Sequence, residues 1–124
     1  VIDHAEKLSV MSSLSATENS EIAILMIDAL RGFEKQDANI SNLIEKEGKP
    51  FLIVINKWDM VSNKKILKSQ IEEKIEEFLP QLGKIKTSYI SAQTGKGIDK
   101  MMESLKEISF ISERKLGTSD LIIF

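Results

Sequence analysis

The chain has 124 residues, of which 42% are hydrophobic and 29% charged, with a formal net charge of −2. This length allows at most one ordinary domain, and the composition is that of a globular protein without a membrane span. The small negative charge argues against a stand-alone DNA- or RNA-binding module. The absence of cysteine excludes disulfides and Cys-based zinc sites, and it favours a cytoplasmic protein.

Predicted helices and strands alternate along the chain. Apolar residues at helical spacing predict helices, and short apolar runs predict buried strands. The predicted helices are residues 4–17, 37–47, 63–79 and one that starts near 97, and the predicted strands are residues 22–27, 51–55 and 85–90. Gly48 and Pro80 are expected to end the second and third helices, and Ile40, Leu43 and Ile44 are expected to face the core. This order predicts βαβ units and a three-layer α/β domain with a parallel sheet.

The second predicted strand runs directly into a polar tetrapeptide, Asn56-Lys57-Trp58-Asp59. Open α/β sheets bind ligands at the carboxyl ends of their strands, where this tetrapeptide is expected to lie. The Asp59 carboxylate only accepts hydrogen bonds and can take two parallel N–H groups. Guanine offers such a pair through N1–H and its 2-amino group, whereas adenine does not. Lys57 is expected to cover the base face with its aliphatic stem. The alternative for Asn56 and Asp59 is a simple Asx turn at the strand end.

The third predicted strand is followed by a loop of small residues, Ser91-Ala92-Gln93-Thr94-Gly95. Small residues let a backbone approach a flat ring closely. The backbone N–H of Ala92 or Gln93 is expected to donate to guanine O6, where adenine carries an amino group. Ser91 and Thr94 are alternatively helix caps. The predicted nucleotide-binding residues are therefore Asn56, Lys57, Asp59, Ser91, Ala92 and Gln93.

These two motifs, in this order, resemble the base-recognition pair of the translation-factor-like P-loop GTPases. Residues 28–37, Asp-Ala-Leu-Arg-Gly-Phe-Glu-Lys-Gln-Asp, and the Trp58 inside the first motif narrow the resemblance to the Der/EngA family, the bacterial double GTPases of ribosome assembly. Residues 6–14 are similar to the segment after switch II in the second GTPase domain of that family. The end of the chain, residues 114–121, looks like the entry to the family's KH-like domain, although Ile122 stands where the family usually carries Asn.

The resemblance implies a domain organisation. Residues 1–116 would be the C-terminal part of the second GTPase domain, without the phosphate-binding portion, and residues 117–124 would begin a KH-like domain or form a tail.

The sequence contains neither Gly-x-x-x-x-Gly-Lys-Ser/Thr nor Asp-x-x-Gly. Such motifs bind the phosphates and Mg²⁺ in these enzymes. The resemblance thus implies GTP or GDP as ligand, with Mg²⁺ bound in the parent protein through residues that this chain lacks. No catalytic or metal residue is assigned, and the chain alone is expected not to hydrolyse GTP. The implied partners are the guanine nucleotide and the large ribosomal subunit with its RNA, and neither DNA nor a membrane.

Two other interpretations remain open. The chain could be a non-catalytic protein-interaction domain derived from a GTPase, or it could belong to another GTPase of the Era-like group. A phosphate-binding loop in the native protein would argue against the first, and a second GTPase domain would argue against the second.

Overall fold

A parallel sheet forms the centre of the molecule in the computed structural model, which describes residues 22–82, 85–111 and 121–124. Within these ranges the sheet has four strands in the order β3-β2-β1-β4, and every neighbouring pair is parallel. The strands are β1 (Ile22–Asp28), β2 (Phe51–Asn56), β3 (Thr87–Tyr89) and β4 (Leu121–Ile123). The three strands predicted from the sequence are all present, and the third is shorter than expected. Ile90, just beyond it, still donates its N–H to the Ile55 carbonyl at 2.8 Å.

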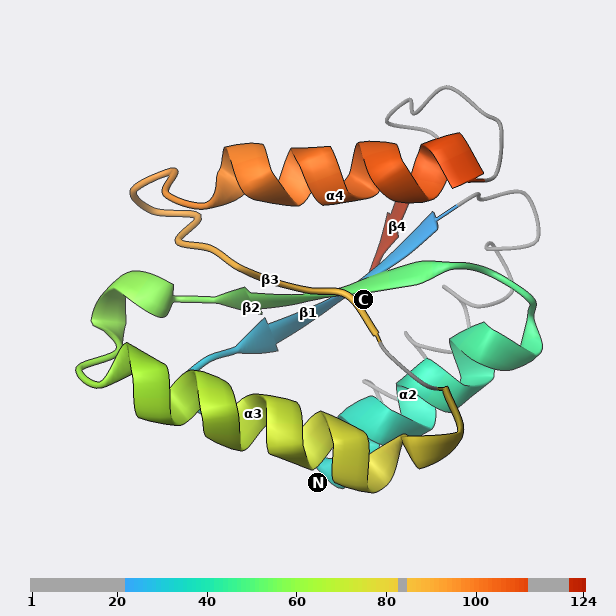
Figure 1. Cartoon of the computed structure of the whole chain (residues 1–124), viewed down its shortest axis with the longest axis horizontal. Helices are drawn as coiled ribbons and strands as arrows, with labels where there is room; N and C mark the ends of the chain where they lie inside the picture. The colour runs from blue at the N-terminus through green and yellow to red at the C-terminus, as the bar shows by residue number, and fades with distance from the viewer. Residues whose placement is uncertain (1–21, 83–84, 112–120) are drawn as a thin grey trace.

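Helices cover both faces of this sheet (Figure 1). Helix α4 lies on one face, and α2 and α3 lie on the other. The helices are α2 (Lys35–Lys46), α3 (Lys64–Phe78) and α4 (Ile98–Ile111), with short 3-10 turns η2 (Trp58–Met60) and η3 (Pro80–Leu82). The predicted three-layer α/β fold is therefore confirmed. The helix predicted for residues 4–17 lies outside the described residues.

Two hydrophobic cores explain the continuous apolar run of β2. Leu52 and Val54 are fully buried against the layer that contains Leu105 of α4. Ile53 and Ile55 alternate with them and are fully buried in the opposite core, against α3. A strand covered on both faces needs apolar residues at every position, as parallel sheets do in general. The same burial fixes where the polar loop after β2 emerges.

Helix α2 begins two residues earlier than predicted because a reciprocal capping box starts it. The Glu34 side chain bonds to the backbone of Asp37, and the Asp37 side chain accepts from the Glu34 N–H at 2.8 Å. The buried stripe of this helix contains Asp37, Ala38, Ser41 and Ile44. The prediction that Leu43 faces the core was wrong, since 42% of it is exposed. Its neighbours at helical spacing place it on the flank of that stripe.

Strand β4 was not predicted. Leu121 pairs in parallel with Ile22, and the Phe124 N–H donates to the Ile24 carbonyl at 2.8 Å. The sequence prediction treated residues 117–124 as the start of a KH-like domain or a tail and did not include this pairing. In the structure, β4 covers the edge of β1 that three strands alone would leave open. A domain boundary after residue 116 stays a prediction.

Candidate functional site

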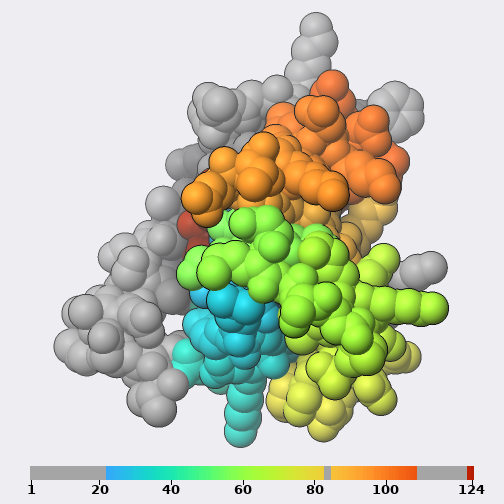
Figure 2. Space-filling view, turned by 90° about the vertical axis from the view of Figure 1, so that its left-hand side faces the viewer, coloured from blue at the N-terminus to red at the C-terminus, as the bar shows by residue number. Residues whose placement is uncertain are grey.

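The carboxyl ends of β1, β2 and β3 meet on one face of the molecule. Figure 2 looks onto this face and shows the segment after β2, in green, between the segments after β1, in blue, and after β3, in orange. Asp28 and Asn56, the last residues of β1 and β2, are register partners. The Trp58 N–H donates to the Ile90 carbonyl at 3.0 Å, which ties the loop after β2 to the end of β3. The predicted loops therefore lie side by side.

Lys57 adopts an unusual backbone conformation and reaches across to β1. Its φ of 64° is in the left-handed region, and no other non-glycine residue in the described part of the chain has a positive φ. Its ammonium donates to Asp28 Oδ2 at 2.9 Å, while Asp28 Oδ1 accepts from the Leu30 N–H at 2.8 Å. The hydrogen bond from Lys57, with that from Leu30, lowers the pKa of Asp28 below its usual value. The carboxylate thus stays ionised and holds the lysine chain across the end of the sheet.

Asn56 joins the two loops directly. Its Oδ1 accepts a hydrogen bond from the Ala92 N–H at 3.0 Å, a contact between residues 36 positions apart. Since the backbone group can only donate, the side-chain oxygen must face it, and the Asn56 amide NH₂ is left to donate elsewhere. Of the two N–H groups expected to reach guanine O6, that of Ala92 is therefore already used. No hydrogen bond within the described residues uses the Gln93 N–H.

The loop after β3 is held together by its own backbone. Ser91 is buried, and its N–H donates to the Lys96 carbonyl at 2.9 Å while its carbonyl accepts from the Gly95 N–H at 2.8 Å. The Ser91 hydroxyl accepts from the Thr94 N–H at 3.1 Å. Ser91 thus shapes the turn and positions its neighbours. Gly97 is sterically required, since a Cβ there would lie 2.3 Å from the Tyr89 carbonyl oxygen.

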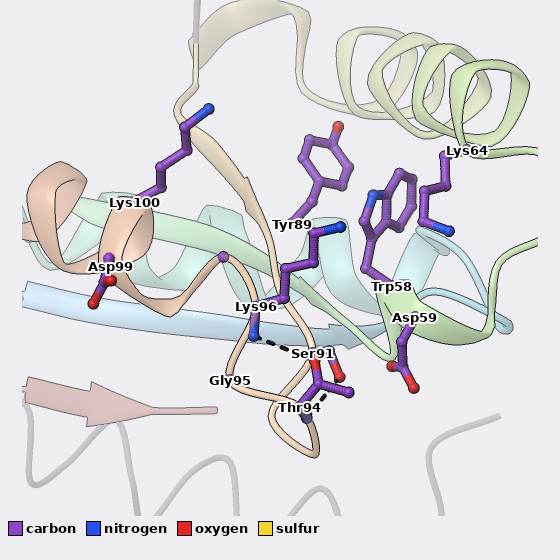
Figure 3. A pocket seen from close by; sticks show the side chains of 11 residues that line it. Trp58, Asp59, Lys64, Tyr89, Ser91, Thr94, Gly95, Lys96, Asp99 and Lys100 are labelled. Atoms are coloured by element: carbon purple, nitrogen blue, oxygen red, sulfur yellow. Dashed lines mark hydrogen bonds between the residues drawn. The ribbon is translucent and has the colours of Figure 1, made fainter.

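Asp59 is exposed on the same face. Within the part of the chain that the structure describes, its carboxylate takes part in none of the hydrogen bonds or ion pairs found. In Figure 3 it points toward the Thr94 side of the β3 loop and away from the rings of Trp58 and Tyr89. Its acceptor capacity is available to a ligand.

The structure brings together all six predicted site residues, and it adds Asp28, which sequence reasoning missed. The available signal was its position: Asp28 is a polar residue at the end of a buried strand, next in the sheet to the strand that ends in Asn56. A cleft of about 960 Å³ beside this face includes Asp59 and Ser91 in its lining, but otherwise extends toward Trp58 and Tyr89. The cleft and the predicted base contacts are therefore adjacent and only partly shared.

Among residues 22–82, 85–111 and 121–124, no group of three or more His, Asp or Glu side chains is arranged to hold a metal ion. No helix in these ranges is both long and apolar enough to cross a bilayer.

The layered parallel sheet and its polar loops define the fold of the P-loop GTPases, and the comparisons with known proteins agree. The elongation factor Tu GTP-binding domain family matches residues 10–109. This match covers most of the chain, which therefore belongs to that family. The chain is 36% identical to GTPase Der of Parvibaculum lavamentivorans over 121 residues, 98% of this chain and 26% of the relative. The predicted resemblance to the Der/EngA family is confirmed.

Solved structures give the same fold. The structure of elongation factor SelB from Methanococcus maripaludis, in complex with the GTP analogue GppNHp, superposes with a TM-score of 0.69 at 19% identity, over 87% of this chain and 24% of that one. The structure of Era in complex with MgGDPNP and nucleotides 1506–1542 of 16S ribosomal RNA gives a TM-score of 0.68 at 26% identity, over 83% of this chain and 33% of that one. The chain spans about a quarter of the length of the Der relative it matches.

Proposed function

We propose that this chain binds the base of a guanine nucleotide and forms the base-recognition half of a GTP-binding site. The observation that carries the proposal is the hydrogen bond from Ala92 to Asn56, which fixes the two recognition loops against each other. Asp59, whose carboxylate has no hydrogen-bond or ion-pair partner among residues 22–82, 85–111 and 121–124, lies on the same face. A preorganised pair of loops binds without first losing the entropy of bringing them together.

Each residue then has a separate task. Asp59 accepts the N1–H and the 2-amino group of guanine, and the Gln93 N–H donates to O6, which together exclude adenine. The Asn56 amide donates to the base edge, while its oxygen stays on Ala92. Lys57 covers one face of the base with its stem, and Ser91 and Asp28 act as positioning residues.

The activity of the whole protein is part of the proposal. Relatives of this chain are named GTPase Der, and the solved Era structure contains a fragment of ribosomal RNA. We infer that the native protein is a cytoplasmic GTPase that acts in assembly of the large ribosomal subunit. The 124-residue chain contains no phosphate-binding motif, so we expect it to show no GTP hydrolysis above background.

A fluorescent-GDP titration tests the proposal, with GTP and ATP as competitors. It should be run on the 124-residue chain and on a form extended at its N-terminus through the phosphate-binding region. Binding by the extended form that GTP competes and ATP does not would support the proposal. Equal competition by ATP would contradict guanine recognition, and no binding by either form would favour a GTPase-derived interaction domain. Phosphate release by the repurified 124-residue chain would refute the expectation that it is inactive.

A further inference from the structure

The cleft beside β3 has a chemistry that guanine recognition leaves unexplained. Two aromatic side chains, Trp58 and Tyr89, and three lysines, Lys64, Lys96 and Lys100, are in its lining. The cleft has a volume of about 960 Å³, and of the predicted base-recognition residues only Asp59 and Ser91 are in its lining. The cleft lies at the β3 edge of the sheet, where β3 pairs only with β2 among the strands that the structure describes.

The two rings pack against each other and against the core beside α3, and the part of each ring that lines the cleft is the aromatic surface open to a ligand. Their centroids lie 4.6 Å apart with the planes tilted by 47°. The Tyr89 hydroxyl donates to Glu72 at 3.1 Å, and burial together with the Glu72 charge raises the pKa of this tyrosine, so it stays a donor. The Lys68 ammonium lies 5.3 Å from the centre of the Tyr89 ring. Aromatic side chains held in this way are suited to stacking with a nucleobase.

Positive charge gathers on the side of the cleft that carries the rings. In Figure 3 the Lys96 chain points toward Tyr89 and Trp58, whereas the carboxylates of Asp59 and Asp99 point away from them. Among the ion pairs of the described residues, none involves Lys96 or Lys100. The Lys64 ammonium donates to the Val61 carbonyl at 3.0 Å and, in the part of the chain that the structure describes, forms no ion pair with a carboxylate.

We propose that this cleft binds a segment of single-stranded RNA, with a base against the Trp58 and Tyr89 rings and phosphates on Lys64, Lys96 and Lys100. Aromatic platforms flanked by lysines are how proteins hold single strands without reading sequence. A run of acidic residues would pair with the lysines but would offer the two aromatic side chains no flat ring to stack on. The choice of RNA rests on the proposed role in ribosome assembly, whereas a stacked base beside phosphates follows from the cleft itself.

The net charge of −2 limits where these 124 residues could bind nucleic acid. Because these 124 residues are slightly acidic in total, they do not attract nucleic acid over their whole surface, so any binding by this part of the protein must depend on the local lysine cluster and on the rings. It should also weaken as salt rises, because each phosphate neutralised by a lysine releases counterions.

The test measures binding of a fluorescein-labelled twelve-nucleotide RNA of mixed sequence to the full-length native protein, by fluorescence anisotropy between about 50 and 200 mM KCl. Tyr89→Leu removes the ring and should weaken binding about tenfold or more, and Tyr89→Phe keeps the ring and should restore it. Lys96→Ala should make the slope of log K against log[KCl] shallower by about 0.7. Lys106→Ala is the matched control, since it removes the same charge from an exposed position on α4 that does not line the cleft.

Circular dichroism would show that each variant is folded. No RNA binding at the lower salt concentration, or equal binding by folded Tyr89→Leu and the unchanged protein, would overturn the proposal. So would competition by poly-glutamate as strong as that by unlabelled RNA, which would indicate an acidic protein partner. GDP binding is measured separately with its own probe, so loss of guanine recognition and loss of RNA binding are distinguishable.

Discussion

The loops after β2 and β3 share one face of the molecule, but they present different kinds of functional group. In the β2 loop the functional groups belong to side chains: the Asp59 carboxylate, the Asn56 amide and the Lys57 stem. In the β3 loop they belong to the backbone, where Ser91 and Gly95 hold a turn whose N–H groups are the useful donors. The two loops therefore tolerate different changes. The β2 loop is sensitive to the charge and donors of its side chains, and the β3 loop is sensitive to added volume.

Asp59→Asn should have the largest effect, and it tests whether the β2 loop acts through its side chains. It replaces a group that only accepts with one that also donates, so a donor of guanine would face a donor. Losing two charge-assisted hydrogen bonds corresponds to about 3 kcal/mol or more, a hundredfold or greater loss of GDP affinity. Xanthine carries a carbonyl in place of the 2-amino group, and its nucleotides should bind the variant better than GDP. Calorimetric titration of the intact protein with GDP and with xanthosine diphosphate would measure both effects, and unchanged GDP affinity would show that Asp59 does not contact the base.

Gly97→Ala should have the second largest effect, and it tests whether the loop after β3 is sensitive to added volume. The new Cβ would lie 2.3 Å from the Tyr89 carbonyl oxygen, so the end of β3 or the loop must move. Gly95→Ala is the matched control, since Gly95 has a similar positive φ of 83° but nothing within 4 Å of the new Cβ. We expect about 1 kcal/mol of destabilisation for Gly95→Ala and at least about 2 kcal/mol for Gly97→Ala. Urea unfolding followed by the fluorescence of Trp58, the only tryptophan in the sequence, would measure the difference. Equal losses would mean that the contact with Tyr89 does not constrain the loop.

Asp28→Asn should have the smallest effect, and it measures how much the ion pair with Lys57 stabilises the loop after β2. The variant keeps an acceptor for the Leu30 N–H but loses the ion pair with Lys57, which is half-exposed and contributes at most about 1 kcal/mol. The lowered pKa of Asp28 sets the sign of the pH dependence. The contribution is present above the ordinary pKa of 3.8 and is lost as the pH falls below that value.

The difference between the unfolding free energies of the unchanged chain and Asp28→Asn, measured from pH 7 down to pH 3, should therefore shrink toward the acid end. A double-mutant cycle with Lys57→Met isolates the coupling between the two side chains. A coupling energy of zero at pH 7 would show that Asp28 does not hold Lys57.

Much of the fold could be predicted from the sequence, because burial on two faces leaves a visible pattern. The run from Phe51 to Ile55 indicated a buried strand, and Gly48 and Pro80 stand just after α2 and α3, as their residue types predicted. The misses were of another kind. Leu43 has the right spacing for a core position but lies beside a stripe that the buried Asp37 and Ser41 define. No local pattern distinguishes β4 from any short apolar segment, since its pairing depends on β1 offering an edge.

By itself the sequence determined which chemical groups are available at the ends of the strands: a carboxylate, an amide, a lysine and a loop of small residues. The tertiary structure decided how these groups are shared. The Asn56 oxygen is taken by Ala92, 36 positions away, and the Lys57 ammonium by Asp28, 29 positions away. Trp58 is likewise packed on Tyr89. Hydrogen bonds and ring contacts act over a few ångströms, so partners this distant along the chain are chosen only when the sheet brings their strand ends together.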